Sequence, residues 1–293
     1  MKLNEINENY INLLKSSLLN ELYIENEAKI VLAVHSIIGN LKLEPSSFLG
    51  VKERESALID LLKDNKSTGN TLKLNSKQPD GTFLAVPEAR NLIELSHTMI
   101  GRKRLDNIQF AIETIIHEDI PGDFIETGIW RGGACIFMKG CLLAFGDNTR
   151  TIWAADSFQG VPEPTWEQDA GFDISENVLP ILTVSIEEVK ELFDRYQLLD
   201  DRVKFLEGWF RDTLPNAPIE KLSLLRLDGD LYESTMDALI PLYDKVVEGG
   251  FIIVDDYYSC PPCKKAITDF MAQNNIQTPL ITIDGHAAYW RKN

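Results

Sequence analysis

Short apolar runs alternate with longer amphipathic segments in the second half of the chain, and this alternation constrains the fold more than any other feature. The runs resemble β-strands and occupy residues 123–128, 151–155, 203–206, 222–227 and 251–254. The segments have apolar residues at helical spacing and occupy residues 108–117, 134–145, 185–196, 235–247 and 263–274. This order predicts an α/β fold with a mostly parallel sheet, helices on both of its faces and right-handed crossovers.

Both ends of the chain depart from this alternation. Helices are predicted at residues 10–19, 27–38 and 88–99, with Pro87 opening the last of them, and a polar loop is predicted at residues 63–82. An antiparallel pair of strands is expected at residues 280–283 and 287–291, joined by Asp284 and Gly285. The sequence therefore divides into an N-terminal helical or lid region, residues 1–106, and an α/β domain, residues 107–293.

The composition excludes several classes of partner. The 293 residues carry a formal net charge of −16, and binding to nucleic acid needs Lys and Arg to neutralise phosphates. The same charge disfavours a basic membrane-binding patch. No run approaches ~18 uninterrupted apolar residues, and the N-terminus lacks the pattern of a signal peptide. We expect a cytoplasmic protein with reduced thiols.

Cys260-Pro-Pro-Cys263 has the spacing of a metal or redox pair. A structural zinc site wants four ligands, and one such pair supplies two. A redox pair would follow the first strand of a thioredoxin-like unit, whereas this pair lies near the C-terminus. A turn before a helix is the favoured interpretation, because proline is common at the first helical position.

Two features after the first strands suggest a cofactor. The glycine-rich stretch Glu126–Ala134 lets the backbone approach a ligand and presents the amides of the next helix. Asp156 follows the second strand, where an acidic side chain can accept both hydroxyls of a ribose. Each feature has a structural alternative, since glycine often simply joins a strand to a helix and Asp often caps one.

Acidic residues also follow two later strands. Asp228-Gly229-Asp230 ends one run, and Asp255-Asp256 ends the next. If these strands are neighbours, the carboxylates meet at one edge and repel each other. A hard divalent cation with oxygen ligands removes this repulsion, although an Asp-Gly turn or a helix cap explains either motif alone. Together the motifs favour a metal site.

These motifs resemble the macrocin O-methyltransferase (TylF-type) family over about residues 85–293, with a fainter match at residues 10–23. The matching stretches are Thr98–Asn107, Phe124–Ala134, Ala155–Phe158, Gly208–Pro215, Leu225–Thr235, Gly249–Tyr257 and Tyr289–Arg291. The resemblance implies a class I methyltransferase fold that uses S-adenosylmethionine and magnesium, with a sugar hydroxyl as acceptor. The extra N-terminal sequence and the insertion at residues 159–180 leave the acceptor open.

The resemblance also implies roles for individual residues. Glu126, Thr127 and Gly128 would border the methionine end of the cofactor, and Asp156 and Ser157 would hold its ribose. Gly208 and Trp209 would lie beside the adenine. Thr98 and Met99 would close over the cofactor, and Asp228 would adjoin the cofactor. Asp228, Asp255 and Asp256 would bind Mg²⁺, and Asp230 would be the general base beside the catalytic Asp228. His286 is an alternative base, but Asp284-Gly285 before it indicates a turn.

Two other functions fit parts of this pattern. Asp228-Gly229-Asp230 has the DxD form of metal-dependent nucleotide-sugar glycosyltransferases, although the glycine turn with Asp156 suits a cofactor that has a ribose and no phosphate. A methyltransferase fold that has lost its activity could serve as a binding subunit, although the presence of all three candidate metal-binding aspartates counts against such a loss. The expected partners are a small hydroxylated, glycosidic acceptor and further copies of this chain in a homo-oligomer.

Overall fold

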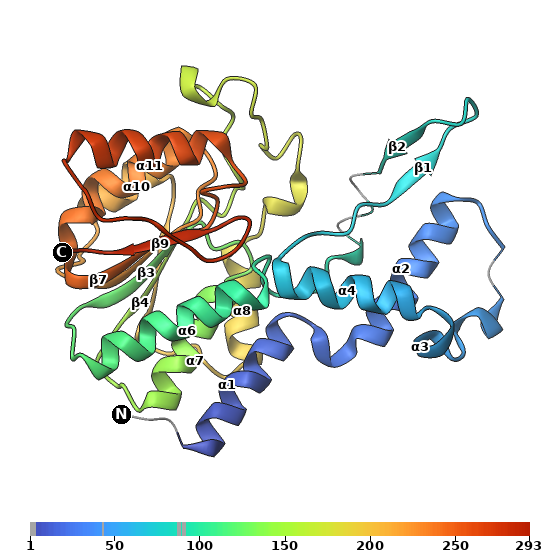
Figure 1. The fold of residues 1–293 in the computed structure, drawn as a ribbon, viewed down its shortest axis with the longest axis horizontal. Helices are drawn as coiled ribbons and strands as arrows, with labels where there is room; N and C mark the ends of the chain where they lie inside the picture. Colours follow the sequence, from blue (N-terminus) through green and yellow to red (C-terminus); the bar gives the residue numbers. More distant parts are fainter. Residues whose placement is uncertain (1–3, 43, 87–88, 90–91) are drawn as a thin grey trace. The chain divides into compact units, whose positions relative to one another are not determined.

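The computed structural model describes residues 4–42, 44–86, 89 and 92–293. The chain divides into two compact units (Figure 1). Met1–Leu14 and Lys103–Asn293 form the first, here called the sheet unit, and Lys15–Arg102 form the second, the helical unit. No helix in the described ranges combines the length and apolar character needed to cross a membrane.

The sheet unit is built on a seven-stranded sheet, counted over the described residues, with the order β5-β4-β3-β6-β7-β9-β8. Its strands are β3 (Asp123–Thr127), β4 (Ile152–Asp156), β5 (Val203–Glu207), β6 (Leu222–Leu227), β7 (Val246–Val254), β8 (Ile281–Thr282) and β9 (Ala288–Arg291). Strands β3 to β7 pair in parallel, whereas β9 pairs antiparallel with both β7 and β8. The predicted α/β fold with a mostly parallel sheet and a final antiparallel pair is confirmed.

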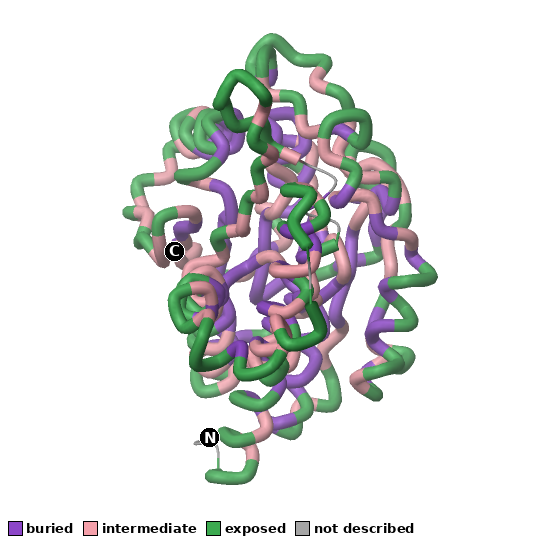
Figure 2. Tube along the Cα trace, turned by 90° about the vertical axis from the view of Figure 1, so that its right-hand side faces the viewer, coloured by how far each residue is buried: buried purple, intermediate pink, exposed green. Residues whose placement is uncertain are grey.

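Helices cover both faces of this sheet (Figure 1). They are α6 (Arg102–His117), α7 (Gly133–Phe145), α8 (Ile186–Arg195), α9 (Phe210–Thr213), α10 (Tyr232–Leu242) and α11 (Pro261–Gln273). Side chains alternate across a strand, so Ile125 and Leu225 face the core shared with α10 and α11. On the opposite face, Phe110 of α6 packs edge-on against Phe251 of β7, with ring centroids 5.9 Å apart. Buried residues run through these strands (Figure 2).

One predicted helix in this unit is too long. The expected helix at residues 235–247 is α10, which ends at Leu242, and a 3-10 turn at Tyr243–Lys245 leads into β7. Val246 already pairs with Leu222 at the start of β6. The β-branched valines therefore begin the strand, because pairing with a buried neighbour outweighs their weak local helical pattern.

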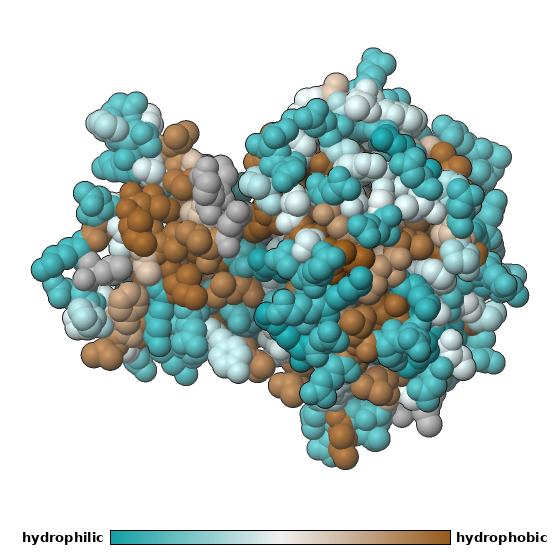
Figure 3. All heavy atoms as spheres, turned by 180° about the vertical axis from the view of Figure 1, so that it is seen from behind, coloured by the Kyte–Doolittle hydropathy of each residue, from teal (hydrophilic) through white to brown (hydrophobic). Residues whose placement is uncertain are grey.

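The helical unit contains α2 (Ile24–Ile38), α3 (Val51–Arg54), α4 (Ser56–Thr68) and the hairpin of β1 (Asn75–Lys77) and β2 (Phe83–Ala85), and it takes in the end of α1 (Glu5–Leu18). Exposed apolar side chains gather on one face of this unit (Figure 3). Over the whole unit, the most exposed large apolar side chains are Tyr23, Ile37, Leu41, Leu49, Phe83, Leu84 and Leu92. The helices predicted at residues 10–19 and 27–38 are confirmed as α1 and α2.

The loop predicted at residues 63–82 is wrong. Residues 63–68 complete α4, and part of the remainder forms the hairpin. The helix persists because Ile59, Leu62 and Lys66 lie at helical spacing and are all buried. Of the helix predicted at residues 88–99, positions 94–99 are not helical, and Pro87, Glu88, Arg90 and Asn91 lie outside the described residues.

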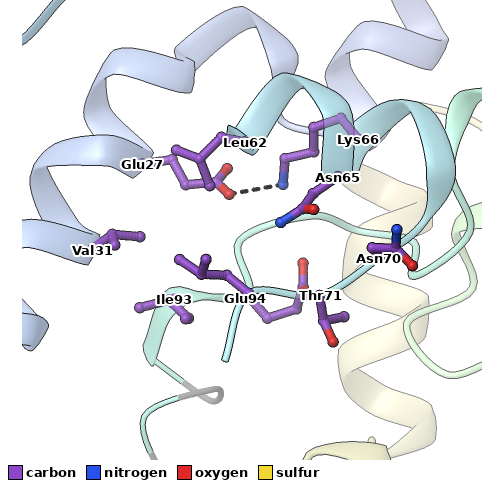
Figure 4. A pocket seen from close by; sticks show the side chains of 10 residues that line it. Glu27, Val31, Leu62, Asn65, Lys66, Asn70, Thr71, Ile93 and Glu94 are labelled. Carbon is purple, nitrogen blue, oxygen red and sulfur yellow. Dashed lines mark ion pairs between the residues drawn. The ribbon is translucent and has the colours of Figure 1, made fainter. Parts of the chain in front are cut away.

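A buried ion pair borders a small cavity in this unit (Figure 4). Lys66 Nζ lies 2.9 Å from Glu27 Oε1 and donates a hydrogen bond of 2.7 Å to Ser96 Oγ. Asn20 Nδ2 donates to Glu27 Oε2 at 2.7 Å. The cavity of about 20 Å³ is lined partly by Asn65 and other polar side chains, so it has room for roughly one water molecule.

Replacing Lys66 by Met is expected to lower the free energy of unfolding by roughly 2–3 kcal/mol. Breaking a buried pair usually costs about 3–5 kcal/mol, and Asn20 still hydrogen-bonds to the remaining Glu27 carboxylate. Urea unfolding measures the change. Lys63→Met on the same helix is the control, because the Lys63 side chain is 60% exposed. Equal effects of the two substitutions would contradict a stabilising buried pair.

Candidate active site

The register of the sheet brings the predicted acidic residues together. Thr127, Leu227 and Val254 are partners at the ends of β3, β6 and β7. The next residues continue this pattern, because Asp228 N–H donates to Thr127 O at 2.9 Å and Asp255 N–H donates to Leu227 O at 2.9 Å. Asp228 and Asp255 therefore leave neighbouring strand ends side by side.

The donor set of this cluster suits a hard divalent cation. Asp228, Asp255 and Asp256 each offer a carboxylate oxygen, and these atoms all lie within 4.8 Å of one another. Asp256 Oδ2 is buried without a hydrogen-bond partner. Burial, followed by the charges of Asp230 and Asp228, raises the pKa of Asp256 well above its usual value. Buried carboxylates in this state are stabilised by a cation with oxygen ligands.

Arg226 also enters the cluster, although no role was predicted for it from the sequence. It lies within β6, and its side chain is 1% exposed. Its guanidinium donates to Glu126, to Asp228 Oδ2 at 2.7 Å and to Asp255. The only sequence signal was a charged residue inside an apolar strand, which requires buried partners.

Arg104 of α6 is a second arginine for which no role was predicted. It donates to Asp255, and its Nε lies 3.2 Å from Asp284 Oδ2. Burial acts to raise the pKa of Asp255, but Arg104 and Arg226 more than offset this and lower it. Both Asp255 oxygens thus accept a guanidinium hydrogen bond, although each keeps a second lone pair. Asp256 is the member with more capacity for a cation.

The arginines leave negative charge in excess. Among the described residues, six carboxyl groups lie in or beside this cluster, against two guanidinium groups; they are Glu126, Asp228, Asp230, Asp255, Asp256 and Asp284. Burial, then the charge of Asp228, raises the pKa of Asp230 to about 7. Burial likewise raises the pKa of Glu126 to about 7, against the opposing effect of Arg226. A divalent cation would reduce this excess.

The glycine turn after β3 packs directly on the acidic cluster. Gly128 has φ +87°, and a Cβ there would lie 1.9 Å from the Asp228 carbonyl oxygen. Only glycine permits both the left-handed backbone and this close approach. The turn therefore fixes β3 against the acidic end of β6.

Asp156 makes the hydrogen bonds of a turn residue. Its Oδ2 accepts from Ile129 N–H at 2.7 Å, and its Oδ1 accepts from Phe158 N–H at 2.8 Å. Its neighbour Ser157 donates to Gly160 O at 2.7 Å. A carboxylate offers about four acceptor positions, so Asp156 retains acceptor capacity for the hydroxyls of a ribose.

The other predicted cofactor residues lie in two places. Gly208 N–H donates to Asp156 O at 2.9 Å, which brings Gly208 and Trp209 beside the end of β4. Thr98 and Met99 belong to the helical unit, and their contact with the cofactor stays a prediction. His286 lies in the turn between β8 and β9, where its N–H donates to Asp284 Oδ1 at 2.8 Å.

The family model for macrocin O-methyltransferases (TylF) matches residues 7–292. This chain belongs to the macrocin O-methyltransferase family. Demethyldecarbamoylnovobiocin O-methyltransferase of Streptomyces niveus is 51% identical over 207 residues, covering 70% of this chain and 79% of that protein. Mycinamicin III 3''-O-methyltransferase of Micromonospora griseorubida is 45% identical over 246 residues, covering 80% and 96%.

Solved structures agree with this assignment. The structure of the O-methyltransferase NovP has a TM-score of 0.76 and 38% identity, covering 98% of this chain and 99% of that chain. The chain is an O-methyltransferase with the class I fold, and its family implies S-adenosylmethionine as the methyl donor. The glycosyltransferase alternative is not favoured.

The insertion of this O-methyltransferase, residues 159–180, caps a helix of the sheet unit. Asp169 is fully buried, and its carboxylate accepts from Tyr232 N–H at 2.6 Å and Glu233 N–H at 3.1 Å. These two amides lie in the first turn of α10, where backbone N–H groups have no acceptor within their own helix. The sequence gave no signal for this cap, because Asp169 is distant from α10 along the chain.

Replacing Asp169 by Ala is expected to destabilise the enzyme by roughly 1–3 kcal/mol. A lost helix cap costs about 0.5–2 kcal/mol, and leaving two buried donors unpaired adds to this. Urea unfolding measures the loss, with Glu167→Ala as the control because Glu167 is exposed in the same 3-10 turn. If the two variants unfold at the same urea concentration, the Asp169 cap has no energetic role.

Cys260-Pro-Pro-Cys263 opens α11, with Cys260 at the N-cap and Pro261 at the first position. The predicted turn before a helix is confirmed. All four cysteines are buried, and none of them forms a disulfide.

Proposed function

We propose that this enzyme transfers the methyl group of S-adenosylmethionine to a hydroxyl of a sugar on a natural product, with Mg²⁺ bound by Asp228, Asp255 and Asp256. The names of its relatives support the acceptor class, since they act on a novobiocin precursor, on mycinamicin III and on a rhamnosyl tetracenomycin. The observation that carries the proposal is the carboxylate cluster at the ends of β6 and β7.

The metal would be held mainly by the carboxylates that the arginines leave available. Asp256 has a buried oxygen without a partner, and Asp228 and Asp255 each keep acceptor positions beside their bonds to Arg226. Bound Mg²⁺ would supply Lewis acidity that lowers the pKa of the acceptor hydroxyl. Arg226 and Arg104 hold the carboxylates in place without occupying all the acceptor positions of the carboxylate oxygens.

Asp230 is the proposed general base. It follows Asp228 in a left-handed backbone conformation, with φ +57°, and its carboxylate lies among the same acidic groups. It would take the proton from the acceptor hydroxyl as that oxygen attacks the methyl carbon. The carbon–sulfur bond breaks, and S-adenosylhomocysteine leaves as a neutral thioether. Alignment of oxygen, carbon and sulfur supplies much of the rate enhancement.

The cofactor residues are proposed as a set around the ends of β3, β4 and β5. Glu126, Thr127 and Gly128 would border the methionine end, with Asp228 adjoining it. Asp156 and Ser157 would hold the ribose, and Gly208 and Trp209 the adenine. Residues 1–106 would act as a lid region in which Thr98 and Met99 close over the cofactor.

Calorimetry and turnover assays together test this function. We expect S-adenosylhomocysteine to bind and UDP not to bind, and we expect methylation of a glycosylated natural product but not of its aglycone. EDTA should abolish turnover, and added Mg²⁺ should restore it. Full activity in excess EDTA would remove the metal from the proposal, and binding of UDP alone would revive the glycosyltransferase alternative.

We also propose that the enzyme is a cytoplasmic homo-oligomer. The exposed apolar side chains of the helical unit, such as Phe83 and Leu84 at 69% and 62% exposure, supply surface for self-association. Light scattering after gel filtration is expected to give a mass that is a multiple of 33.1 kDa. If only the mass of the monomer is found at micromolar concentration, self-association is contradicted.

A further inference from the structure

A thiol lies next to the proposed magnesium position and belongs to a second cluster of ligand atoms. Cys260 Sγ is 3.4 Å from Asp230 Oδ1, and atoms of Asp230, Asp256 and Cys260 all lie within 4.8 Å of one another. Cys260 is 7% exposed and Asp256 is 9% exposed. The two clusters share Asp256, but only this second one includes sulfur.

The second cluster lacks the cations that neutralise the first. Arg226 and Arg104 bond to Glu126, Asp228 and Asp255. Within the described ranges of the chain, no basic side chain forms an ion pair with Asp230 or Asp256. Asp256 Oδ2 is buried without a hydrogen-bond partner among the described residues. The carboxyl groups that lack a cationic partner therefore lie beside the thiol.

The sulfur atom of Cys260 decides which cations suit this cluster. A cation that accepts sulfur ligands deprotonates a coordinating thiol outright, and the proton passes to solvent. Mg²⁺ prefers oxygen ligands only, whereas Zn²⁺ and Cd²⁺ bind thiolate and carboxylate together.

We propose that Cys260, Asp230 and Asp256 form a binding site for a thiophilic divalent cation, Zn²⁺ or Cd²⁺, which adjoins the proposed magnesium position and shares Asp256 with it. Three protein ligands leave the fourth position of a tetrahedral zinc ion open. Occupancy makes Asp230 a ligand and removes it as a proton acceptor. Zinc therefore inhibits methyl transfer; this consequence rests on the proposed function, whereas the site itself does not.

X-ray absorption of the zinc-loaded full-length enzyme tests the site without any assay of turnover. We expect one sulfur at about 2.3 Å from zinc together with oxygen ligands at about 2.0–2.2 Å. A zinc shell with oxygen and nitrogen ligands only would overturn the proposal. This measurement uses the native chain, so its outcome does not depend on the folding of a variant.

Cadmium titration of variants then assigns the sulfur. The ultraviolet sulfur-to-cadmium band is expected in the native enzyme and in Cys141→Ala, a matched control because Cys141 is also a buried cysteine outside any disulfide. Cys260→Ala should lose the band, and Asp230→Asn should weaken cadmium binding by at least about tenfold. A band that persists in folded Cys260→Ala would overturn the assignment. If zinc has a sulfur ligand but turnover needs no magnesium, the zinc site stands and only the proposed function is refuted.

Discussion

Asp256→Asn is expected to lower kcat by about 10³-fold while S-adenosylhomocysteine affinity changes by less than about threefold. Metal stabilisation of a transition state is worth several kcal/mol, and about 1.4 kcal/mol corresponds to a tenfold change in rate. Asp256 is the most informative of the three aspartates because, among described residues, it bonds to neither arginine of the cluster, whereas Asp228 and Asp255 both bond to Arg226. Its loss therefore tests cation binding with little effect on the arginine network.

Two measurements separate this effect from a general loss of structure. Calorimetry with S-adenosylhomocysteine reports whether the cofactor pocket is intact, and a magnesium titration of turnover reports the apparent affinity for the metal. Asp244→Asn is the control, since Asp244 is exposed after α10. If Asp256→Asn keeps the native dependence on magnesium, Asp256 is not a metal ligand.

Arg226→Met is expected to destabilise the enzyme by roughly 3–5 kcal/mol at pH 8. The substitution leaves Glu126 buried without its cation and removes one of the two cations that bond to Asp255. Removing one partner from a buried charge cluster leaves charge uncompensated, and this costs about 3–5 kcal/mol. Urea unfolding measures the loss. Arg195→Met is the control, because Arg195 pairs with Glu191 on the surface at 61% side-chain exposure.

The deficit of Arg226→Met should shrink as the pH falls. Burial raises the pKa of Glu126 from 4.5 to about 7 even with Arg226 present, and removing Arg226 raises it further. In the window from 4.5 to about 7, the unfolded chain loses its proton while the folded protein keeps it, so stability falls as pH rises. Protonation at pH 5 neutralises the carboxyl group. A deficit that is the same at pH 5 and pH 8 would show that Arg226 acts by packing alone.

Most of the sheet could be predicted because strand and helix periodicity are local properties. The runs at residues 123–128, 151–155 and 222–227 fall on β3, β4 and β6 with small shifts at their ends. Parallel order then places the residues after these strands at one edge. The predicted meeting of Asp228 with Asp255 and Asp256 follows from that order and from the register of β6 with β7.

Predictions failed where tertiary contacts outweighed local composition. Residues 63–68 are polar enough to suggest a loop, yet they extend α4 because Lys66 is buried against Glu27 on another helix. Residues 246 and 247 continued the predicted helix, yet they begin β7 because β6 was available to pair with Val246. In both cases a partner distant in sequence supplied the stabilising contact.

The sequence by itself determined the alternating fold, the acidic and glycine-rich strand ends, and the family to which these motifs point. Only the tertiary structure decided which carboxylates are neutralised by arginine and which are left for a cation. Arg104 and Asp255 are 151 positions apart, and Arg226 and Glu126 are 100 apart. Buried charges take whichever opposite charge the packing brings within hydrogen-bonding distance, and no local pattern in a chain records that choice.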